Sequence, residues 1–183
     1  MRVISGTLKG RTLRSPTWEG LRPTSDRLRE TLFNVLAPRL PGARVLDVYA
    51  GTGALGIEAL SRGATWATFV ESDRRAQTLI VENLARCGLV EGYAIIRAAA
   101  DRAFETLAAS PGRAPFDIIL LDPPYDRSAA DALTGADRFV AQDGIVVIEH
   151  ARRSPTPETA GRLERTRELL SGDSALAFYT CRH

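Results

Sequence analysis

The sequence is poor in the residues that build disulfides, metal centres and membrane spans. Its 183 residues include two cysteines and two histidines. Cys87 and Cys181 follow no ligand or disulfide spacing, so we expect a reduced, cytoplasmic protein. His150 and His183 are too scattered for a metal site, and we expect none. The sequence also lacks a secretory leader pattern and an apolar run long enough to cross a bilayer, so we expect no membrane association.

Lysine is nearly absent, and the basic residues are unevenly distributed. Lys9 is the single lysine, and the net charge of the chain is only +2. Residues 1–44 hold nine basic and three acidic side chains, whereas residues 45–183 hold 15 basic and 19 acidic ones. A basic end on a mildly acidic body predicts a polyanion-binding surface near the N-terminus. A solvated arm without a partner would show the same pattern, and that alternative stays open.

The strongest local pattern is an apolar run, a pair of glycines and a helix over residues 45–60. The apolar run is typical of a buried strand. It breaks at Gly51 and Gly53, and the apolar spacing that follows predicts a helix that ends at Gly63. In an open α/β sheet, such a strand, turn and helix form a ligand site at the carboxyl end of the first strand. Glycines let the backbone approach a ligand, and the helix start offers free N–H groups.

The glycines alone do not decide which ligand binds at this turn. Residues 51–56 satisfy the G-x-G-x-x-G fingerprint of dinucleotide sites, and Glu71 stands where that fingerprint places a ribose-binding acid. A turn that only packs a helix on a sheet is another alternative. Asp47 favours S-adenosylmethionine (AdoMet), because a carboxylate there would repel a pyrophosphate but can engage the cationic methionine end of AdoMet. A nicotinamide oxidoreductase is therefore disfavoured.

Apolar periodicity, together with glycine and proline positions, predicts the order of elements. From residue 44 onward strands and helices alternate, which predicts an α/β fold with a mostly parallel sheet and right-handed crossovers. We expect strands over 44–50, 66–71, 93–98, 116–121 and 144–150, and helices over 53–62, 74–87, 101–109 and 128–141, the last broken at Gly135. At the end of the chain, residues 163–169 and 176–180 are expected to form a closing antiparallel hairpin.

The first part of the chain predicts a small extension in front of this sheet. Residues 2–16 have the pattern of two short strands around a glycine-containing turn. Thr24-Ser25-Asp26 then predicts a capped helix start, followed by one apolar face through Leu36. We therefore divide the chain into a basic extension over 1–43, expected to dock on RNA, and a methyltransferase domain over 44–183.

A tetrapeptide, Asp122-Pro123-Pro124-Tyr125, follows the apolar strand predicted at 116–121. Its chemistry suits an exocyclic amino group on a planar ring, whose delocalised lone pair makes it a poor nucleophile. The Asp122 carboxylate and the Pro123 carbonyl can accept both N–H protons, which favours the pyramidal, nucleophilic amine. The prolines fix φ and remove N–H donors, and Tyr125 offers a flat face for a base. A diproline turn that only ends a strand is the structural alternative.

The chain resembles a known family over almost its whole length. The resemblance rests on residues 6–11 and 21–36, which carry its specificity, and on 47–64 and 122–125, which many amino-methyltransferases share. The chain is similar to the bacterial RsmD family, which methylates guanine-966 of 16S ribosomal RNA on N2. This resemblance implies the Rossmann-like fold of class I AdoMet-dependent methyltransferases, with a mostly parallel, seven-stranded sheet that ends in the antiparallel hairpin.

The resemblance implies roles for individual residues, and the charge pattern adds others. The implied catalytic residues are Asp122, Pro123 and Tyr125. The implied AdoMet-binding residues are Asp47, Tyr49, Ala50, Gly51, Thr52, Gly53, Glu71, Ser72, Asp101 and Asp122. Among them, Glu71 would hold the ribose hydroxyls and Asp101 the adenine amino group, although Ala100 stands where relatives commonly have glycine. The residues that charge selects for RNA contact are Lys9, Arg11, Arg22, Arg27 and Arg29.

The expected reaction consumes AdoMet and releases S-adenosylhomocysteine, and no metal takes part. The expected partner is 16S rRNA within an assembling small ribosomal subunit, bound by a monomeric enzyme. Methylation of DNA adenine on N6 or of protein glutamine on N5 stays open, because the tetrapeptide alone does not choose among amino groups. A non-catalytic ribosome-assembly factor is a further alternative, which the intact Asp122 and Tyr125 disfavour.

Overall fold

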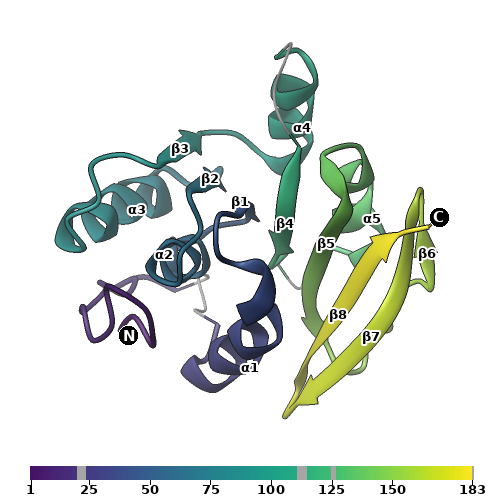
Figure 1. The fold of residues 1–183 in the computed structure, drawn as a ribbon, viewed down its shortest axis with the longest axis horizontal. Helices are drawn as coiled ribbons and strands as arrows, with labels where there is room; N and C mark the ends of the chain where they lie inside the picture. The colour runs from purple at the N-terminus through teal and green to yellow at the C-terminus, as the bar shows by residue number, and fades with distance from the viewer. Residues whose placement is uncertain (20–23, 111–114, 125–126, 183) are drawn as a thin grey trace.

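The fold is built on one central sheet, shown in the computed structural model of Figure 1. The structure describes residues 1–19, 24–110, 115–124 and 127–182. The strands follow the order β3-β2-β1-β4-β5-β8-β7-β6 across the sheet. Their bounds are Arg44–Val48 (β1), Trp66–Val70 (β2), Tyr93–Ile96 (β3), Phe116–Leu121 (β4), Val140–Ala151 (β5), Thr159–Ala160 (β6), Leu163–Ser171 (β7) and Ser174–Cys181 (β8). The pairs from β3 to β5 are parallel, and the pairs from β5 to β6 are antiparallel.

Helices cover both faces of the sheet, so the molecule has three layers (Figure 1). The helices are Asp26–Leu36 (α1), Ala54–Ser61 (α2), Arg74–Arg86 (α3), Ala100–Ala108 (α4) and Ala129–Leu133 (α5), with 3₁₀ turns at Ala37–Arg39 (η1) and Ala136–Arg138 (η2). Successive side chains of a strand point to opposite faces. In β4, Ile118 and Leu120 therefore join the cluster of α1 and α2, whereas Ile119 and Leu121 join that of α4 and α5. Burial on both faces explains the apolar sequence of this strand.

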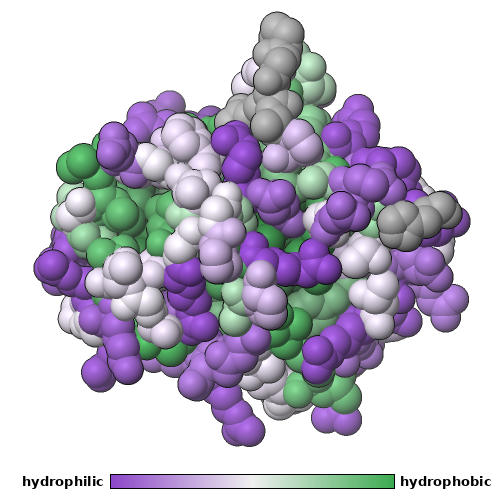
Figure 2. Space-filling model, in the orientation of Figure 1, coloured by the Kyte–Doolittle hydropathy of each residue, from purple (hydrophilic) through white to green (hydrophobic). Residues whose placement is uncertain are grey.

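The edge of the sheet at β3 is partly open to solvent. All residues of β3 are half-buried, and Val81 on the neighbouring α3 is 43% exposed. Figure 2 shows the corresponding hydrophobic area in green over α3 and β3, on a face that is otherwise mainly hydrophilic. At the opposite edge, the long hairpin of β7 and β8 extends the sheet, and the short β6 pairs with β7 (Figure 1).

The structure confirms the predicted order of elements, with two differences in detail. The strand at 116–121 has the predicted bounds, and the C-terminal hairpin is antiparallel as expected. The sheet has eight strands rather than seven, because residues 159–160 pair with β7 as the short strand β6. The helix predicted over 128–141 is interrupted by Gly135, whose φ is 84°, and its last residues are wrong because Val140 already begins β5.

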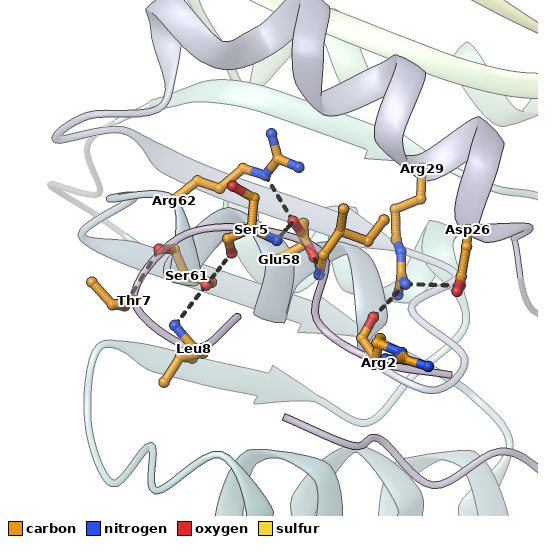
Figure 3. A network of polar contacts seen from close by, with 10 residues as sticks. Arg2, Ser5, Thr7, Leu8, Asp26, Arg29, Glu58, Ser61 and Arg62 are labelled. Atoms are coloured by element: carbon orange, nitrogen blue, oxygen red, sulfur yellow. Dashed lines mark hydrogen bonds and ion pairs between the residues drawn. The ribbon is translucent and has the colours of Figure 1, made fainter. Parts of the chain in front are cut away.

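The N-terminal segment, residues 1–19, does not form the two predicted strands. A single antiparallel bridge joins Arg2 to Thr12. The backbone N–H groups of residues 4 and 5 instead donate to the Glu58 carboxylate on α2, at 2.8 and 3.0 Å (Figure 3). A strand ladder requires partners for the same kind of backbone group. The prediction was therefore only partly right. The two arms pair through backbone hydrogen bonds from Val3 to Arg11, from Gly10 to Val3 and from Leu13 to Met1, but residues 4 and 5 turn to α2 and no continuous ladder forms.

The same segment closes one end of the core. Val3 and Leu13 are 1% and 2% exposed and belong to a hydrophobic cluster with Ile57 of α2. Gly6 approaches α2 so closely that a Cβ there would stand 1.8 Å from the carbonyl oxygen of Ser61. The N-terminal segment is thus a packed part of the body, tied to α2 by apolar contacts and hydrogen bonds (Figure 3).

Candidate active site

Three acidic side chains meet at the carboxyl ends of neighbouring strands. Asp47 lies on β1, Glu71 follows β2 and Asp122 follows β4, and β1 lies between the other two strands. Asp122 and Glu71 are both near enough to Asp47 to raise the pKa of its carboxyl group. From β1 the chain passes first to β2 and β3 on one side, and later to β4 and β5 on the other. Open α/β sheets bind ligands where the strand order reverses in this way.

Asp47 is a buried carboxylate with an incomplete set of hydrogen bonds. Its side chain is 1% exposed, and Oδ2 accepts a hydrogen bond of 2.9 Å from the backbone N–H of Gly56. Oδ1 is buried without a hydrogen-bond partner among the described residues. Burial raises the pKa of Asp47 well above its ordinary value. A cationic ligand group would satisfy Oδ1 and favour the ionised form, so the residue fits the ammonium end of AdoMet.

The turn after β1 holds its backbone in the left-handed region. The angle φ is 64° at Tyr49, 55° at Gly51 and 77° at Gly53. Positive φ is uncommon for a residue other than glycine, and such strain gathers at functional sites. Gly53 is the N-cap of α2 and has no side chain to cap the first turn, where Asp47 accepts from the N–H of Gly56. The turn therefore offers backbone donors to a ligand at the carboxyl edge of the sheet.

Hydrogen bonds to β2 and α3 hold this turn in place. The N–H of Ala50 donates to the carbonyl of Val70 at the end of β2, at 3.0 Å. The buried Asn83 of α3 donates to the carbonyl of Thr52 at 2.9 Å and also bonds the backbone of Arg14, at 2.7 and 3.1 Å. Asn83 thereby connects the glycine turn to the N-terminal segment. Sequence reasoning missed this connection, since an asparagine within a helix carries no signal of its partners.

Glu71 supports the turn from β2. Its Oε2 accepts a hydrogen bond of 2.8 Å from the N–H of Gly51, and its Oε1 accepts from the N–H groups of Ser72 and Asp73. A carboxylate oxygen can accept more than one hydrogen bond. Oε2 therefore keeps acceptor capacity for a hydroxyl group, which suits the ribose role predicted for Glu71.

Asp101 lies in the first turn of α4, across a cavity from the tetrapeptide. Its carboxylate forms an ion pair of 2.7 Å with Arg127, whose guanidinium lies 5.8 Å from the centre of the Tyr49 ring. Asp101, Pro124 and Arg127 line this cavity of about 540 Å³ together with Asp131 and Thr134. The cavity has room for a flat ring system, and Arg127 connects it to Tyr49 of the turn after β1. Arg127 was not predicted, although it follows the tetrapeptide by only two positions.

Asp122 follows β4 and is held by a residue from a distant part of the chain. The hydroxyl of Thr24 donates to Asp122 Oδ2 at 3.0 Å. Burial and, to a smaller extent, the negative charge of Glu149 raise the pKa of Asp122 to about 7, and the hydrogen bond from Thr24 opposes both effects. Pro123 is half-buried behind it. Tyr125 lies outside the described residues, so its predicted role stays a prediction.

The residues selected for RNA contact have different surroundings. Lys9, Arg11 and Arg27 are exposed, and Arg22 lies outside the described residues. Arg29 is fully buried, and its Nη2 donates to the Arg2 carbonyl at 2.6 Å and pairs with Asp26 at 3.0 Å (Figure 3). This burial contradicts the prediction that Arg29 contacts RNA. Its charge instead ties the start of the chain to α1.

Within the described parts of the chain, neither metal ligands nor membrane spans are found. No group of three or more His, Cys, Asp or Glu side chains stands in an arrangement that could hold a metal ion. No described helix combines the length and the apolar character that a bilayer crossing requires.

Comparison with known proteins decides the family. Residues 1–180 match the model of the family described as Conserved hypothetical protein 95. The chain belongs to this family. It is 41% identical over 182 residues to the "Putative rRNA methyltransferase YlbH" of Bacillus subtilis, with 98% of each chain covered. It is 37% identical over 182 residues to the "Ribosomal RNA small subunit methyltransferase D" of Escherichia coli K12, with 98% of this chain and 89% of that one covered. The resemblance to the RsmD family is confirmed.

Solved structures of similar proteins confirm the fold of this family member. The "Putative methyltransferase yhhF" of Escherichia coli superposes with a TM-score of 0.83 at 34% identity, covering 99% of this chain and 97% of that one. A hypothetical protein of Thermus thermophilus gives a TM-score of 0.84 at 30% identity, with 97% of this chain and 98% of that one covered. The fold is therefore the Rossmann-like methyltransferase fold, with its antiparallel hairpin at the end of the sheet.

Proposed function

We propose that this protein transfers a methyl group from AdoMet to the exocyclic N2 amino group of a guanine in 16S rRNA. The observation that carries the proposal is the placement of Asp47 and Asp122 at the carboxyl ends of adjacent strands, at the point where the strand order reverses. One carboxylate suits the cationic cofactor, and the other suits an amino group. The two curated relatives are named as rRNA methyltransferases, which supports ribosomal RNA as the substrate class.

The cofactor side of the site uses the turn after β1. Asp47 would accept from the ammonium group of AdoMet through its unpaired Oδ1, and Glu71 would accept from the ribose hydroxyls through Oε2. Asp101 would meet the adenine amino group in the cavity that it lines with Arg127. AdoMet supplies a methyl group already activated on a sulfonium, so the remaining catalytic task is mainly alignment.

The acceptor side uses the tetrapeptide. The ionised Asp122 and the Pro123 carbonyl accept hydrogen bonds from the guanine amino group, which localises the nitrogen lone pair toward the methyl group. The nitrogen would form its bond to the methyl carbon while the sulfur–methyl bond of the sulfonium breaks and S-adenosylhomocysteine leaves. Asp122, whose pKa of about 7 suits it to this step, can take up the proton that the amine loses. Tyr125 stacks on the base in this proposal, as its sequence position predicts.

The RNA side of the site uses the basic surface near the N-terminus. Lys9, Arg11 and Arg27 are exposed and can contact phosphates, and Arg22 remains a further candidate by sequence. We propose that the monomeric protein acts in the cytoplasm on 16S rRNA held in an assembling small subunit, and that it releases S-adenosylhomocysteine without the help of a metal.

Primer extension on rRNA tests the substrate and the position together. Small-subunit rRNA from a strain lacking this protein should lose one methylation stop at guanine-966, and expression of the protein should restore it. Calorimetric titration should give binding of AdoMet and none of NAD. Binding of NAD alone would favour an oxidoreductase, and AdoMet binding with an unchanged rRNA pattern would favour DNA or protein as the methyl acceptor.

A further inference from the structure

The hydroxyl of Thr24 reaches the carboxylate that the proposed chemistry needs. Thr24 Oγ1 donates to Asp122 Oδ2 at 3.0 Å, although the two residues are 98 positions apart in the sequence. Thr24 belongs to the part of the chain in front of the catalytic sheet, which sequence reasoning assigned only to RNA docking. The contact therefore links that part of the chain directly to the acceptor side of the site.

The position of Thr24 is fixed by the helix that follows it. Ser25 is the N-cap of α1, with φ −60° and ψ 147°, and its side chain accepts from the N–H of Leu28 at 3.2 Å. Leu28 and Leu32 are each 3% exposed and pack against the sheet in one cluster with Ile118 and Leu120 of β4. The backbone at Thr24 is thus held by a capped helix that is docked on the strand leading to Asp122.

The charges that face Asp122 do not hold its carboxylate in place. Glu149 on β5 and Asp47 on β1 are the charged groups that interact with it from the neighbouring strands, and both are acidic. Their repulsion favours a rotated or protonated Asp122 side chain. Among the described side chains, the hydroxyl of Thr24 is the donor that opposes this repulsion.

We propose that Thr24 is a positioning residue for methyl transfer, whose hydroxyl fixes the Asp122 carboxylate so that Oδ1 is presented to the guanine amino group. This inference rests on the proposed function, since it assigns Asp122 to the acceptor amine. The hydroxyl bond uses Oδ2, so the two carboxylate oxygens have separate tasks. Because Arg27 lies on the first turn of the same helix and is exposed, the start of α1 serves both RNA contact and the orientation of Asp122.

The test compares Thr24→Val, which keeps the shape and removes the hydroxyl, with Thr24→Ser, which keeps the hydroxyl. We expect kcat for rRNA methylation to fall by roughly 10–100-fold in Thr24→Val, the range for losing one hydrogen bond to a charged group. The acid limb of its pH–rate profile should move up by about one pH unit, because a donor to the carboxylate no longer favours the ionised form. AdoMet affinity should not change, and Thr24→Ser should recover most of the activity.

Thr31→Val is the matched control, because the Thr31 hydroxyl on the same helix donates only to the backbone carbonyl of Arg27, at 3.0 Å. It should behave as wild type. Wild-type kcat and pH profile in folded Thr24→Val, or failure of Thr24→Ser to recover activity, would overturn the inference. Thr24→Ala replaces Thr24→Val if thermal melting shows that the valine variant is unfolded.

A carbon-13 NMR titration of the Asp122 carboxyl group separates this inference from the proposed function. A higher pKa of Asp122 in Thr24→Val than in wild type supports positioning by Thr24 even if no RNA is methylated, and an equal pKa overturns it. Absence of methyl transfer by the wild-type protein would count against the proposed function alone.

Discussion

Asp47 is the residue on which the electrostatics of the site depend most. Its carboxylate is buried, one oxygen is bonded to the N–H of Gly56, and the other is buried without a partner among the described residues. Such a group opposes folding, because its charge has lost water and gained only part of the hydrogen bonding that would replace it. A cationic ligand completes the shell, and in our proposal that ligand is the methionine end of AdoMet.

We expect Asp47→Asn to raise stability and weaken AdoMet binding. Burial raises the pKa of Asp47, so the folded state binds the proton more tightly than the unfolded chain. Stability is therefore lost as the pH rises from the unfolded pKa near 3.8 through the raised pKa of the folded state. Asparagine removes this loss, so the melting temperature of the variant should exceed that of wild type increasingly as the pH rises. AdoMet binding, measured by calorimetry, should weaken by about 1–3 kcal/mol.

Asp117→Asn is the matched control for this prediction. Asp117 also accepts a backbone N–H, from Arg44 at 2.8 Å, but it is exposed near the amino end of β4. The control should leave AdoMet affinity unchanged. Wild-type AdoMet affinity in folded Asp47→Asn would remove Asp47 from the cofactor site.

Asp122 should control turnover rather than cofactor binding. We expect Asp122→Ala to lower kcat by about 10²–10³-fold, as for loss of one preorganised group that stabilises a transition state. In wild type, kcat should fall as the pH drops through about 7, because protonation of Asp122 removes an acceptor for the guanine amine. Steady-state rates across this pH range and an AdoMet titration provide the measurement. An equal loss of AdoMet affinity in the alanine variant would place Asp122 in the cofactor pocket instead.

At the scale of residues, sequence reasoning succeeded where spacing alone decides position. Asp47, Glu71 and Asp122 were each predicted at or just after the end of a parallel strand, and the structure brings all three to one edge of the sheet. Thr24 was assigned only to a helix cap region, because its bond to Asp122 depends on how α1 docks. Arg29 was selected by charge alone, and charge does not reveal burial.

At the scale of elements, hydrogen bonds attach the N-terminal segment to α2. Glu58 is fully buried, accepts two N–H groups of the segment, and pairs with Arg62 at 2.7 Å (Figure 3). One turn further along α2, the hydroxyl of Ser61 donates to the carbonyl of Ser5 and accepts from the N–H of Leu8. Because α2 begins at the glycine turn, this attachment also supports the proposed AdoMet site.

Two glycines of the segment allow a matched test of this attachment. Gly6 and Gly10 have nearly equal φ values of 86° and 84°, but only at Gly6 would a Cβ meet α2, whereas at Gly10 nothing lies within 4 Å. Alanine in the left-handed region should destabilise either variant by about 1–2 kcal/mol. Gly6→Ala should lose about 1–3 kcal/mol more, because the backbone of Ser61 would have to move. Urea unfolding measures the free energy of unfolding of both variants. Equal losses of stability would show that Gly6 is not in close contact with α2.

The predicted elements are accurate where burial of one face decides the conformation, and less accurate where a partner far away in the sequence decides it. Strands and helices with strong apolar periodicity, such as β4 and α3, were predicted to within one residue, since burial of one face decides their conformation. The hairpin expected at the N-terminus is only partly formed. Its two arms pair at a single bridge and three backbone hydrogen bonds, and the backbone of residues 4 and 5 bonds to a helix that lies far away in the sequence. The two-residue strand β6 is too short to leave a periodic signal.

At the scale of the whole molecule, the basic surplus of the first 44 residues lies on a packed part of the body. Removing the N-terminal segment to test RNA docking would also remove Val3 and Leu13 from the core. Charge reversal of exposed residues tests the same idea without this damage. Lys9, Arg11 and Arg27 are the described candidates.

We expect the triple variant Lys9→Glu/Arg11→Glu/Arg27→Glu to bind rRNA more weakly, with unchanged AdoMet affinity. Its salt dependence should be shallower, because each lost phosphate contact removes about 0.7–0.9 from the log–log slope. Arg167→Glu, at an exposed position in the middle of β7, is the control with reversed charge, since β8 and β5 separate that strand from β4. Equal effects of both variants on the salt slope would show a non-specific response to net charge, and the docking surface would have to lie elsewhere.

The measurement that tests the central claim most directly is the identity of the methylated nucleoside. Small subunits whose 16S rRNA lacks this methylation would be incubated with the protein and isotopically labelled AdoMet, and the rRNA would be digested and analysed by mass spectrometry. The account predicts label in N2-methylguanosine, approaching one per subunit with wild type and nearly absent with Asp122→Ala. Label in N6-methyladenosine, or no label in the rRNA while AdoMet binds normally, would contradict it.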